Sequence, residues 1–289
     1  AHPAAGLFLK PGMGKTSVAL TVADRLLYDS FEVSKVLVIA PLRVAEDTWS
    51  RESEKWGHLR HLRISKVLGT AQQRRAALAR SADVYCINRE NVAWLVKYYG
   101  LKWPFDLVIV DELSSFRNPS SQRFKALRKV RPLIKHLWGL TGTPRPRSLL
   151  DLWAQVYLLD QGERLGRTFT AYRNQYFTPG RQNGYVIYEW KPRPGAEDQV
   201  YSLISDICVS LETKGNVKMP ELVETVRPVV LSPEARALYE SMERDALLEL
   251  AEDVIDAGSA AAVNGKLLQI AGGAVYDEDH VAHELHTDK

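Results

Sequence analysis

Residues 6–17 contain a glycine-bearing turn that could hold a triphosphate. The segment reads Gly-Leu-Phe-Leu-Lys-Pro-Gly-Met-Gly-Lys-Thr-Ser. Gly12 and Gly14 let the backbone direct N–H groups toward phosphate oxygens, the following helix presents its positive end, and Lys15 adds a point charge. The usual eight-residue motif has glycine where this chain has Leu9, so the prediction rests on the GxGKT core, against the alternative of a chance glycine turn. The predicted nucleotide-binding residues are Lys10, Pro11, Gly12, Met13, Gly14, Lys15, Thr16 and Ser17.

Two carboxylates, Asp111 and Glu112, end the wholly apolar run 107–110. A buried core does not tolerate such charges without a purpose. In a nucleotide-binding sheet, Asp111 with the hydroxyl of Thr16 would hold Mg²⁺, while Glu112 would polarise the attacking water. We therefore predict Glu112 and Lys15 as catalytic, with an ordinary acidic turn as the alternative.

These residues need a scaffold of alternating strands and helices. Apolar runs of strand length occur at 6–9, 36–40, 83–87, 107–110 and 136–140, and helical patterns lie between several of them. The clearest pattern, 15–28, places Val18, Val22 and Leu26 on one face. This order predicts an α/β fold with a mostly parallel sheet covered by helices on both sides.

The sequence changes character after Pro146. A helical pattern covers 149–159, and Asn183-Gly184 precedes residues 185–190 as a plausible hairpin turn. Residues 200–211 indicate a further helix and 226–231 one more strand. A long acidic helix is expected over 233–257, with Ser232 as its N-cap and Pro233 at the first helical position.

Composition narrows the class of protein. With 289 residues, 45% hydrophobic, the chain can build a real core, and its longest apolar runs fall short of a membrane span. Cys86 and Cys208 are too far apart for a CxxC pair, which argues against a zinc site or a disulfide framework and favours a reducing cytoplasm. The net charge is +3, but residues 117–147 carry nine Lys or Arg and no acid. That block suits either a polyanion or a solvated helix face.

Four segments together resemble the first RecA-like lobe of a superfamily-two helicase-like ATPase of the Swi/Snf type. They are Lys10-Pro-Gly-Met-Gly-Lys-Thr16, Val38-Ile-Ala-Pro-Leu-Arg43 with Trp49, Asp111-Glu-Leu-Ser114 leading to Phe116-Arg-Asn118, and Leu140-Thr-Gly-Thr-Pro144 with Asp151-Leu-Trp153. Ser114 stands where this group often has histidine, and the DELS form resembles phage and prophage members. A viral or bacterial source, and work in the cytoplasm of a bacterium or phage-infected host, are therefore expected.

The resemblance implies a RecA-like P-loop fold, Mg²⁺ and ATP as cofactors, and DNA, with duplex favoured, as the partner. It implies that seven residues contact a nucleic-acid backbone or couple the nucleotide state to the grip on nucleic acid: Pro41, Arg43, Arg117, Asn118, Thr141, Gly142 and Thr143. It implies an ATP-binding core over 1–145, a helical or hairpin insertion over 146–225, and a last strand, acidic helix and linker over 226–289. A second RecA-like lobe is expected C-terminal to this chain, because no QxxGRxxR arginine segment occurs within it, and Gly272-Gly273 resembles the link. The isolated lobe would then hydrolyse ATP weakly.

The function expected on this basis is ATP-driven translocation on DNA, without a membrane partner. Two alternatives stay open: a nucleotide-gated module that binds DNA or protein without productive hydrolysis, and an RNA helicase. Two weaker signals favour ordinary structure: His280, His283 and His286 lie in a polar tail, and the aromatics of 94–103 are typical of packing within the lobe.

Overall fold

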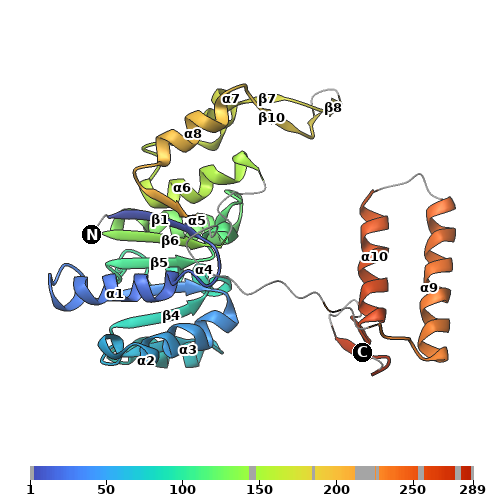
Figure 1. The fold of residues 1–289 in the computed structure, drawn as a ribbon, viewed down its shortest axis with the longest axis horizontal. Coiled ribbons are helices and arrows are strands. Elements are labelled where there is room, and N and C mark those ends of the chain that lie inside the picture. Colours follow the sequence, from blue (N-terminus) through green and yellow to red (C-terminus); the bar gives the residue numbers. More distant parts are fainter. Residues whose placement is uncertain are drawn as a thin grey trace. The chain divides into compact units, whose positions relative to one another are not determined.

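A computed structural model describes residues 3–142, 148–183, 186–211, 225, 228–252, 257–276 and 281–287 (Figure 1). The chain divides into two compact units, Ala1–Lys218 and Met219–Lys289. The larger unit contains every described residue of the predicted nucleotide site. The three ranges expected from the family resemblance stay a prediction.

A seven-stranded parallel sheet forms the centre of the larger unit, with strand order β11-β1-β6-β5-β2-β4-β3. Its strands are β1 (Ala4–Leu9), β2 (Val36–Ala40), β3 (Ile64–Val67), β4 (Val84–Asn88), β5 (Leu107–Asp111), β6 (His136–Thr141) and β11 (Cys208–Leu211). Every residue of β2, β4, β5 and β6 is buried, as expected of a parallel sheet covered on both faces. The mostly parallel α/β sheet and its five predicted strands are confirmed, with ends shifted by at most two residues.

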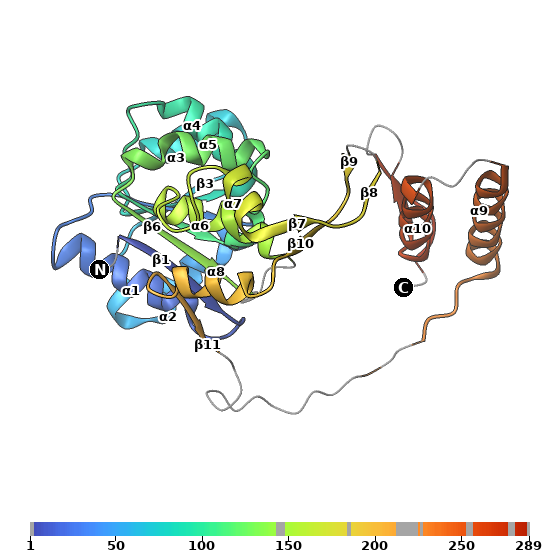
Figure 2. The same cartoon turned by 90° about the horizontal axis from the view of Figure 1, so that it is seen from above.

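Helices cover the two faces of this sheet separately (Figure 2). One face carries α1 (Lys15–Tyr28) and α2 (Trp49–Lys55), and the bounds of α1 match the predicted pattern. The other face carries α3 (Ala71–Ala79), α4 (Val92–Tyr99), α5 (Gln122–Val130), α6 (Leu152–Asp160), α7 (Phe169–Tyr176) and α8 (Ala196–Ile204). Short helical turns at Val44–Thr48, Gly57–Leu59, Arg89–Asn91, Leu113–Phe116, Arg131–Leu133 and Leu149–Asp151 connect these elements.

The segment after α6 contains the predicted hairpin. Strand β8 (Gln182–Asn183) pairs antiparallel with β9 (Val186–Ile187), while Gly184 and Tyr185 lie outside the described residues. Strands β7 (Phe177–Pro179) and β10 (Trp190–Pro192) continue the same antiparallel arrangement. The hairpin is therefore confirmed.

The helix predicted over 200–211 is wrong in its second half. Helix α8 ends at Ile204, and residues 208–211 form β11, which adds to the sheet edge beside β1. A Cβ atom on Gly6 of β1 would come within 2.8 Å of the Cys208 sulfur, so a larger residue at position 6 would have to displace that side chain. Pairing with β1 outweighs the local helical pattern. The strand predicted over 226–231 is also wrong for residues 228–231, which belong to no strand, while residues 226 and 227 lie outside the described residues.

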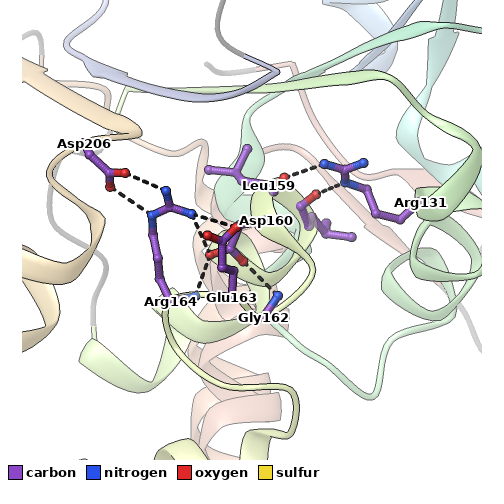
Figure 3. Close-up of polar contacts among 8 residues, drawn as sticks. Arg131, Leu159, Asp160, Gly162, Glu163, Arg164 and Asp206 are labelled. Carbon is purple, nitrogen blue, oxygen red and sulfur yellow. Dashed lines mark hydrogen bonds and ion pairs between the residues drawn. The ribbon is translucent and has the colours of Figure 1, made fainter.

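Two arginines tie the end of α6 to its surroundings (Figure 3). Arg131 is buried, and its guanidinium donates to the carbonyl oxygens of Leu158 and Leu159, both at 2.5 Å, at the C-terminal end of that helix. Arg164 donates to both carboxylate oxygens of Asp206, at 2.9 and 2.5 Å, just before β11. It also pairs at 3.4 Å with Asp160, whose side chain is only 1% exposed. The network therefore fixes α6 and the approach to β11.

The smaller unit contains a pair of helices and a short hairpin. Its elements are α9 (Pro233–Glu252), α10 (Ala257–Ala271), β12 (Ala274–Tyr276) and β13 (Ala282–Glu284). The Ser232 hydroxyl accepts a hydrogen bond from the Ala235 N–H at 3.4 Å, as an N-cap does, and confirms the predicted helix start. Among the described residues no helix is long and apolar enough to cross a bilayer, and no cluster of His, Cys, Asp and Glu could hold a metal.

We expect Arg164→Ala to lower the free energy of unfolding by about 2–3 kcal/mol, because Asp160 would stay buried without its charged partner. Urea denaturation of the purified chain measures this. Arg167→Ala, at an exposed position, is the matched control and should change the value by less than ~0.5 kcal/mol. Equal effects of the two substitutions would contradict the role given to this network.

Candidate nucleotide and nucleic-acid site

Four neighbouring strands bring the predicted site residues to one edge of the sheet. Strands β1, β6, β5 and β2 are consecutive and parallel, so their carboxyl ends lie side by side. The registers pair Phe8 with Thr141, and Leu140 with Asp111. Ligands of open α/β sheets bind at this edge. The glycine turn, the acidic pair, the residues after β2 and the start of the Thr-Gly-Thr segment are thus assembled from distant parts of the chain.

The loop between β1 and α1 has the backbone of a phosphate cradle. Gly12 and Gly14 have φ of 80° and 73°, in the left-handed region that favours glycine. No side chain caps α1, whose first residue is Lys15, so its first N–H groups point toward the loop without a side-chain acceptor. The Lys15 ammonium donates to the carbonyl oxygens of Leu9, at 2.7 Å, and Lys10, at 3.1 Å. Its side chain therefore lies across the loop where a triphosphate would need it.

Asp111 is held at the end of β5 by a buried hydrogen bond. The Trp49 indole N–H donates to its Oδ2 at 3.1 Å, and both side chains are buried. A single turn of π-helix, Val44–Thr48, leads the chain from β2 to Trp49. Such turns are rare and frequently occur at functional sites. The sequence singled out Trp49 only as part of a family segment, and nothing in the residue pattern predicted this contact.

The carboxyl group of Asp111 sits in a balance of opposing effects. Burial raises its pKa and the neighbouring Glu112 carboxylate adds to this, while the Trp49 hydrogen bond and the Lys15 ammonium lower it; the net result is a raised pKa. One carboxylate and the hydroxyl of Thr16 are the ligands that Mg²⁺ takes from protein when phosphates and water supply the rest. The donor set fits that ion.

Glu112 occupies an unusual backbone conformation. Its φ and ψ are both 60°, a left-handed geometry that costs a non-glycine residue about 1–3 kcal/mol. The Ser114 hydroxyl donates to Glu112 Oε2 at 3.3 Å. In place of the family's usual histidine, Ser114 therefore contacts the predicted catalytic carboxylate directly.

Gly142 lies between the phosphate loop and the acidic pair. A Cβ atom there would be 3.3 Å from Pro11 Cδ and 3.9 Å from Glu112 Oε1. Gly139, in β6, would place a Cβ atom against the buried side chain of Leu113, so its absence lets the residue after Glu112 pack flat on β6. Three predicted segments thus meet within contact distance, whereas Thr143 lies outside the described residues.

The residues predicted to contact nucleic acid differ in how exposed their side chains are to solvent. Arg43 and Arg117 are exposed, Pro41 is half-buried and Thr141 is buried. The Asn118 side-chain oxygen accepts the Ser120 N–H at 2.8 Å and so stabilises the turn before α5. These assignments stay predictions.

Within the part of the basic block that the structure describes, residues 117–142, the Lys and Arg side chains have different surroundings. Arg131 is buried, Lys135 pairs with Asp106 at 2.9 Å, and the Arg128 guanidinium lies 4.7 Å from the centre of the Tyr157 ring. Four basic residues of this range are exposed and have no acidic partner among the contacts given above: Arg117, Lys125, Arg128 and Lys129. Among the aromatics of 94–103, ring pairs such as Trp103 with Phe105, 5.3 Å apart, confirm packing within the lobe.

Comparisons with known proteins agree with this geometry. A family model, the SNF2-related domain, matches residues 4–271. Putative protein p41 of Acyrthosiphon pisum secondary endosymbiont phage 1 is 41% identical over 275 residues, which is 93% of this chain and 60% of the phage protein. The human helicase-like transcription factor is 26% identical over 223 residues, 72% of this chain and 20% of that protein. The chain therefore spans 60% of the phage protein's length and a fifth of the human protein's length.

A solved structure shows the same fold. The Sulfolobus solfataricus SWI2/SNF2 ATPase core, described in complex with double-stranded DNA, superimposes with a TM-score of 0.58 at 22% identity. The match covers 92% of this chain and 53% of that core. The predicted RecA-like fold and the predicted Swi/Snf and phage resemblance are confirmed.

We expect Asp111→Asn to stabilise the nucleotide-free protein at neutral pH. A raised pKa means that ionisation of Asp111 disfavours the folded state. The protonated carboxyl group therefore contributes stability that is fully present below the unfolded pKa of ~3.9 and is lost as the pH rises through the folded pKa. The gain in unfolding free energy should therefore shrink as the pH falls toward ~4. Chemical denaturation at several pH values measures it.

Asp106→Asn is the matched control with the opposite sign. Burial alone would raise the pKa of Asp106, but hydrogen bonds from Ser34 and Lys135 together outweigh it and lower the pKa. This substitution should therefore destabilise the protein at pH 7, with a loss that fades as the pH falls through the folded pKa. A destabilising Asp111→Asn at neutral pH would contradict the balance described for that carboxyl group.

Proposed function

This chain belongs to the SNF2-related family, and from that premise we propose that it is the nucleotide-binding lobe of a DNA-dependent ATPase that moves along duplex DNA. The observation that carries the proposal is the meeting of Pro11, Glu112 and Gly142 at one sheet edge. A change at the nucleotide phosphates would reach the Thr-Gly-Thr segment directly through these contacts. Such a path is what a motor needs in order to couple hydrolysis to its grip on DNA.

For ATP hydrolysis we assign separate roles to the loop and the acidic pair. The N–H groups at the start of α1 and the ammonium of Lys15 hold the β and γ phosphates. Thr16 and Asp111 would hold Mg²⁺, which when bound supplies charge that stabilises the transferring phosphoryl group. Glu112 orients the attacking water and takes its proton, with Ser114 at 3.3 Å limiting how far that carboxylate can turn.

For DNA, we propose contacts with the phosphate backbone by Arg43 and Arg117, both exposed and both following a strand that ends at the site edge. Pro41, Asn118 and Thr141 would shape the backbone around them. Such contacts position a duplex without reading its sequence. The Sulfolobus core that shares this fold is described with double-stranded DNA, which supports a duplex as the partner.

We further propose that productive hydrolysis requires a second RecA-like lobe, which would contribute arginines to the transferring phosphate. The coverage of only 53% of the Sulfolobus ATPase core supports this division of labour. Such an arginine is typically worth ~10³-fold or more in rate. Lobe closure over ATP and reopening after hydrolysis would then be converted into steps along one DNA strand.

Steady-state ATP hydrolysis by the full-length protein tests the activity. Duplex DNA should raise the rate above that with single-stranded DNA, RNA or no nucleic acid. Glu112→Gln should lower the rate by roughly 10²–10⁴-fold with ATP binding retained, since it removes the proton acceptor. Lys15→Ala should abolish binding as well, and Glu54→Gln, at an exposed position on α2, is the control that should leave the rate unchanged.

Other outcomes separate the rival functions. A rate that nucleic acids do not change, together with a Glu112→Gln variant that keeps its biological function, would indicate a nucleotide-gated binding module. Greater stimulation by RNA than by DNA would indicate an RNA helicase. Either result would overturn the proposal of a duplex DNA motor.

The salt dependence of duplex binding tests the backbone contacts. Arg43→Ala and Arg117→Ala should each weaken binding to unrelated duplex sequences alike and reduce the slope of log K against log salt by about 1. Arg51→Ala is the matched control, because this exposed arginine is paired with Asp47 at 2.9 Å. An unchanged slope in both test variants would remove Arg43 and Arg117 from the proposed DNA path.

A further inference from the structure

The hydrogen bond between Trp49 and Asp111 determines which oxygen of the carboxylate is free to meet a ligand. The Trp49 indole N–H donates to Asp111 Oδ2 at 3.1 Å. Trp49 is 0% exposed, so the side of the carboxylate that faces this indole is closed to a hydrated ion. Oδ2 is therefore held toward the interior of the protein, and Oδ1 is the oxygen left for a ligand.

Packing leaves the Trp49 side chain little freedom to move. It is the first residue of α2, directly after the π-helical turn Val44–Thr48. It belongs to the same buried apolar cluster as Leu20 of α1 and Ile109 of β5. An indole has a single N–H donor on a rigid ring. The surrounding core therefore fixes the direction of this N–H, and the Asp111 carboxylate has to turn to meet it.

Burial of an indole does not by itself require a carboxylate as acceptor. Trp153 of α6 is only 2% exposed, and its N–H donates to the backbone carbonyl oxygen of Gly166 at 3.0 Å. A neutral carbonyl thus satisfies a buried indole elsewhere in the same unit. The acceptor of Trp49 is instead the charged group predicted to hold Mg²⁺, which indicates a role for this bond at the site in addition to packing.

Mg²⁺ and Ca²⁺ differ in how they use a carboxylate. Mg²⁺ is small, demands near-ideal octahedral geometry and usually keeps several waters beside its carboxylate and phosphate ligands. Ca²⁺ is larger, accepts more oxygens in flexible geometry, and often takes both oxygens of one carboxylate. A carboxylate with one oxygen held by a buried indole can offer an ion only the other. Such a ligand suits Mg²⁺ and denies Ca²⁺ the two-oxygen contact.

We propose that Trp49 is a positioning residue that makes the nucleotide site selective for Mg²⁺ over Ca²⁺, because it holds Asp111 Oδ2 away from the ion. The inference rests on the proposed function, since it needs Asp111 to be a ligand of the nucleotide-bound metal. Without the indole N–H, the carboxylate can turn and present both oxygens. That change adds a ligand for Ca²⁺ and none for Mg²⁺. Trp49 thus acts only through Asp111.

Binding of the nonhydrolysable analogue AMP-PNP to the full-length protein, measured by calorimetry in Mg²⁺ and separately in Ca²⁺, tests the inference without turnover. The parent protein should bind AMP-PNP more tightly in Mg²⁺. Trp49→Phe removes the N–H but keeps an aromatic ring, and should lower the ratio of the Mg²⁺ to the Ca²⁺ affinity by roughly ten-fold, as for a weaker hydrogen bond to a charged group. Loss of packing alone would weaken both complexes alike and leave this ratio unchanged.

Trp153→Phe is the matched control, because it removes the same atoms from another buried indole whose acceptor is a backbone carbonyl. It should leave the ratio of the two affinities unchanged. Since Trp49→Phe also leaves a space in the core, incorporation of benzothienylalanine at position 49 provides a second variant, in which sulfur replaces the N–H and the ring keeps its shape. It should lower the ratio as well, and it decides the test if Trp49→Phe does not fold.

Asp111→Asn separates failure of this inference from failure of the proposed function. It should weaken AMP-PNP binding in both metals and leave binding in EDTA unchanged. If it does so while the sulfur-containing variant keeps the parent ratio, the metal site stands and the role of Trp49 is overturned. A parent protein with no preference for Mg²⁺ overturns that role too. If metal does not improve AMP-PNP binding to the parent, or Asp111→Asn leaves the metal effect intact, the assignment of Asp111 as a metal ligand fails and the role of Trp49 fails with it.

Discussion

The pairing of β6 between β1 and β5 is the constraint on which the site depends. Because all three strands are parallel and in fixed register, Leu9, Thr141 and Asp111 must end at the same sheet edge. The close packing that follows is possible because Gly139 and Gly142 carry no Cβ atom where Leu113 and Pro11 come near. The chemistry therefore relies on backbone hydrogen bonds first, and on catalytic side chains only once those bonds have aligned them.

The site also works against the stability of the fold that supports it. Asp111 is buried with a raised pKa, and Glu112 adopts a left-handed backbone that its side chain disfavours. The covered sheet and the buried arginine network offset these costs. Strain and a destabilised carboxylate at one end of a well-packed sheet are typical of a site maintained for function, since a sequence selected for stability alone would remove them.

Much of this arrangement could be predicted from the sequence, because its signals are local. The apolar runs of β2 and β5 are fully buried strands, the α1 pattern repeats over four turns, and the glycine turn lies between a strand and a helix as its chemistry requires. What could not be predicted depends on distant partners. Residues 208–211 form a strand only because β1 offers an edge, and the Trp49 contact with Asp111 depends on a π-helical turn. Likewise, Arg131 and Arg164 look like surface charges in sequence, but Arg131 donates to buried carbonyl oxygens and Arg164 pairs with the buried Asp160 carboxylate.

The order of strands has a consequence for how the protein emerges from the ribosome. Strand β1, which precedes the phosphate loop, pairs with β6 and β11. Ala4 therefore has no sheet partner until Leu137 of β6 has been synthesised. Strands β2, β4 and β5 can pair with one another much earlier in synthesis. The nucleotide loop thus belongs to the last part of the sheet to close, and long-range parallel pairing of this kind is slow. During that interval the apolar strand β1 has no sheet partner, so the nascent chain exposes a hydrophobic segment of the kind that makes folding intermediates prone to aggregate.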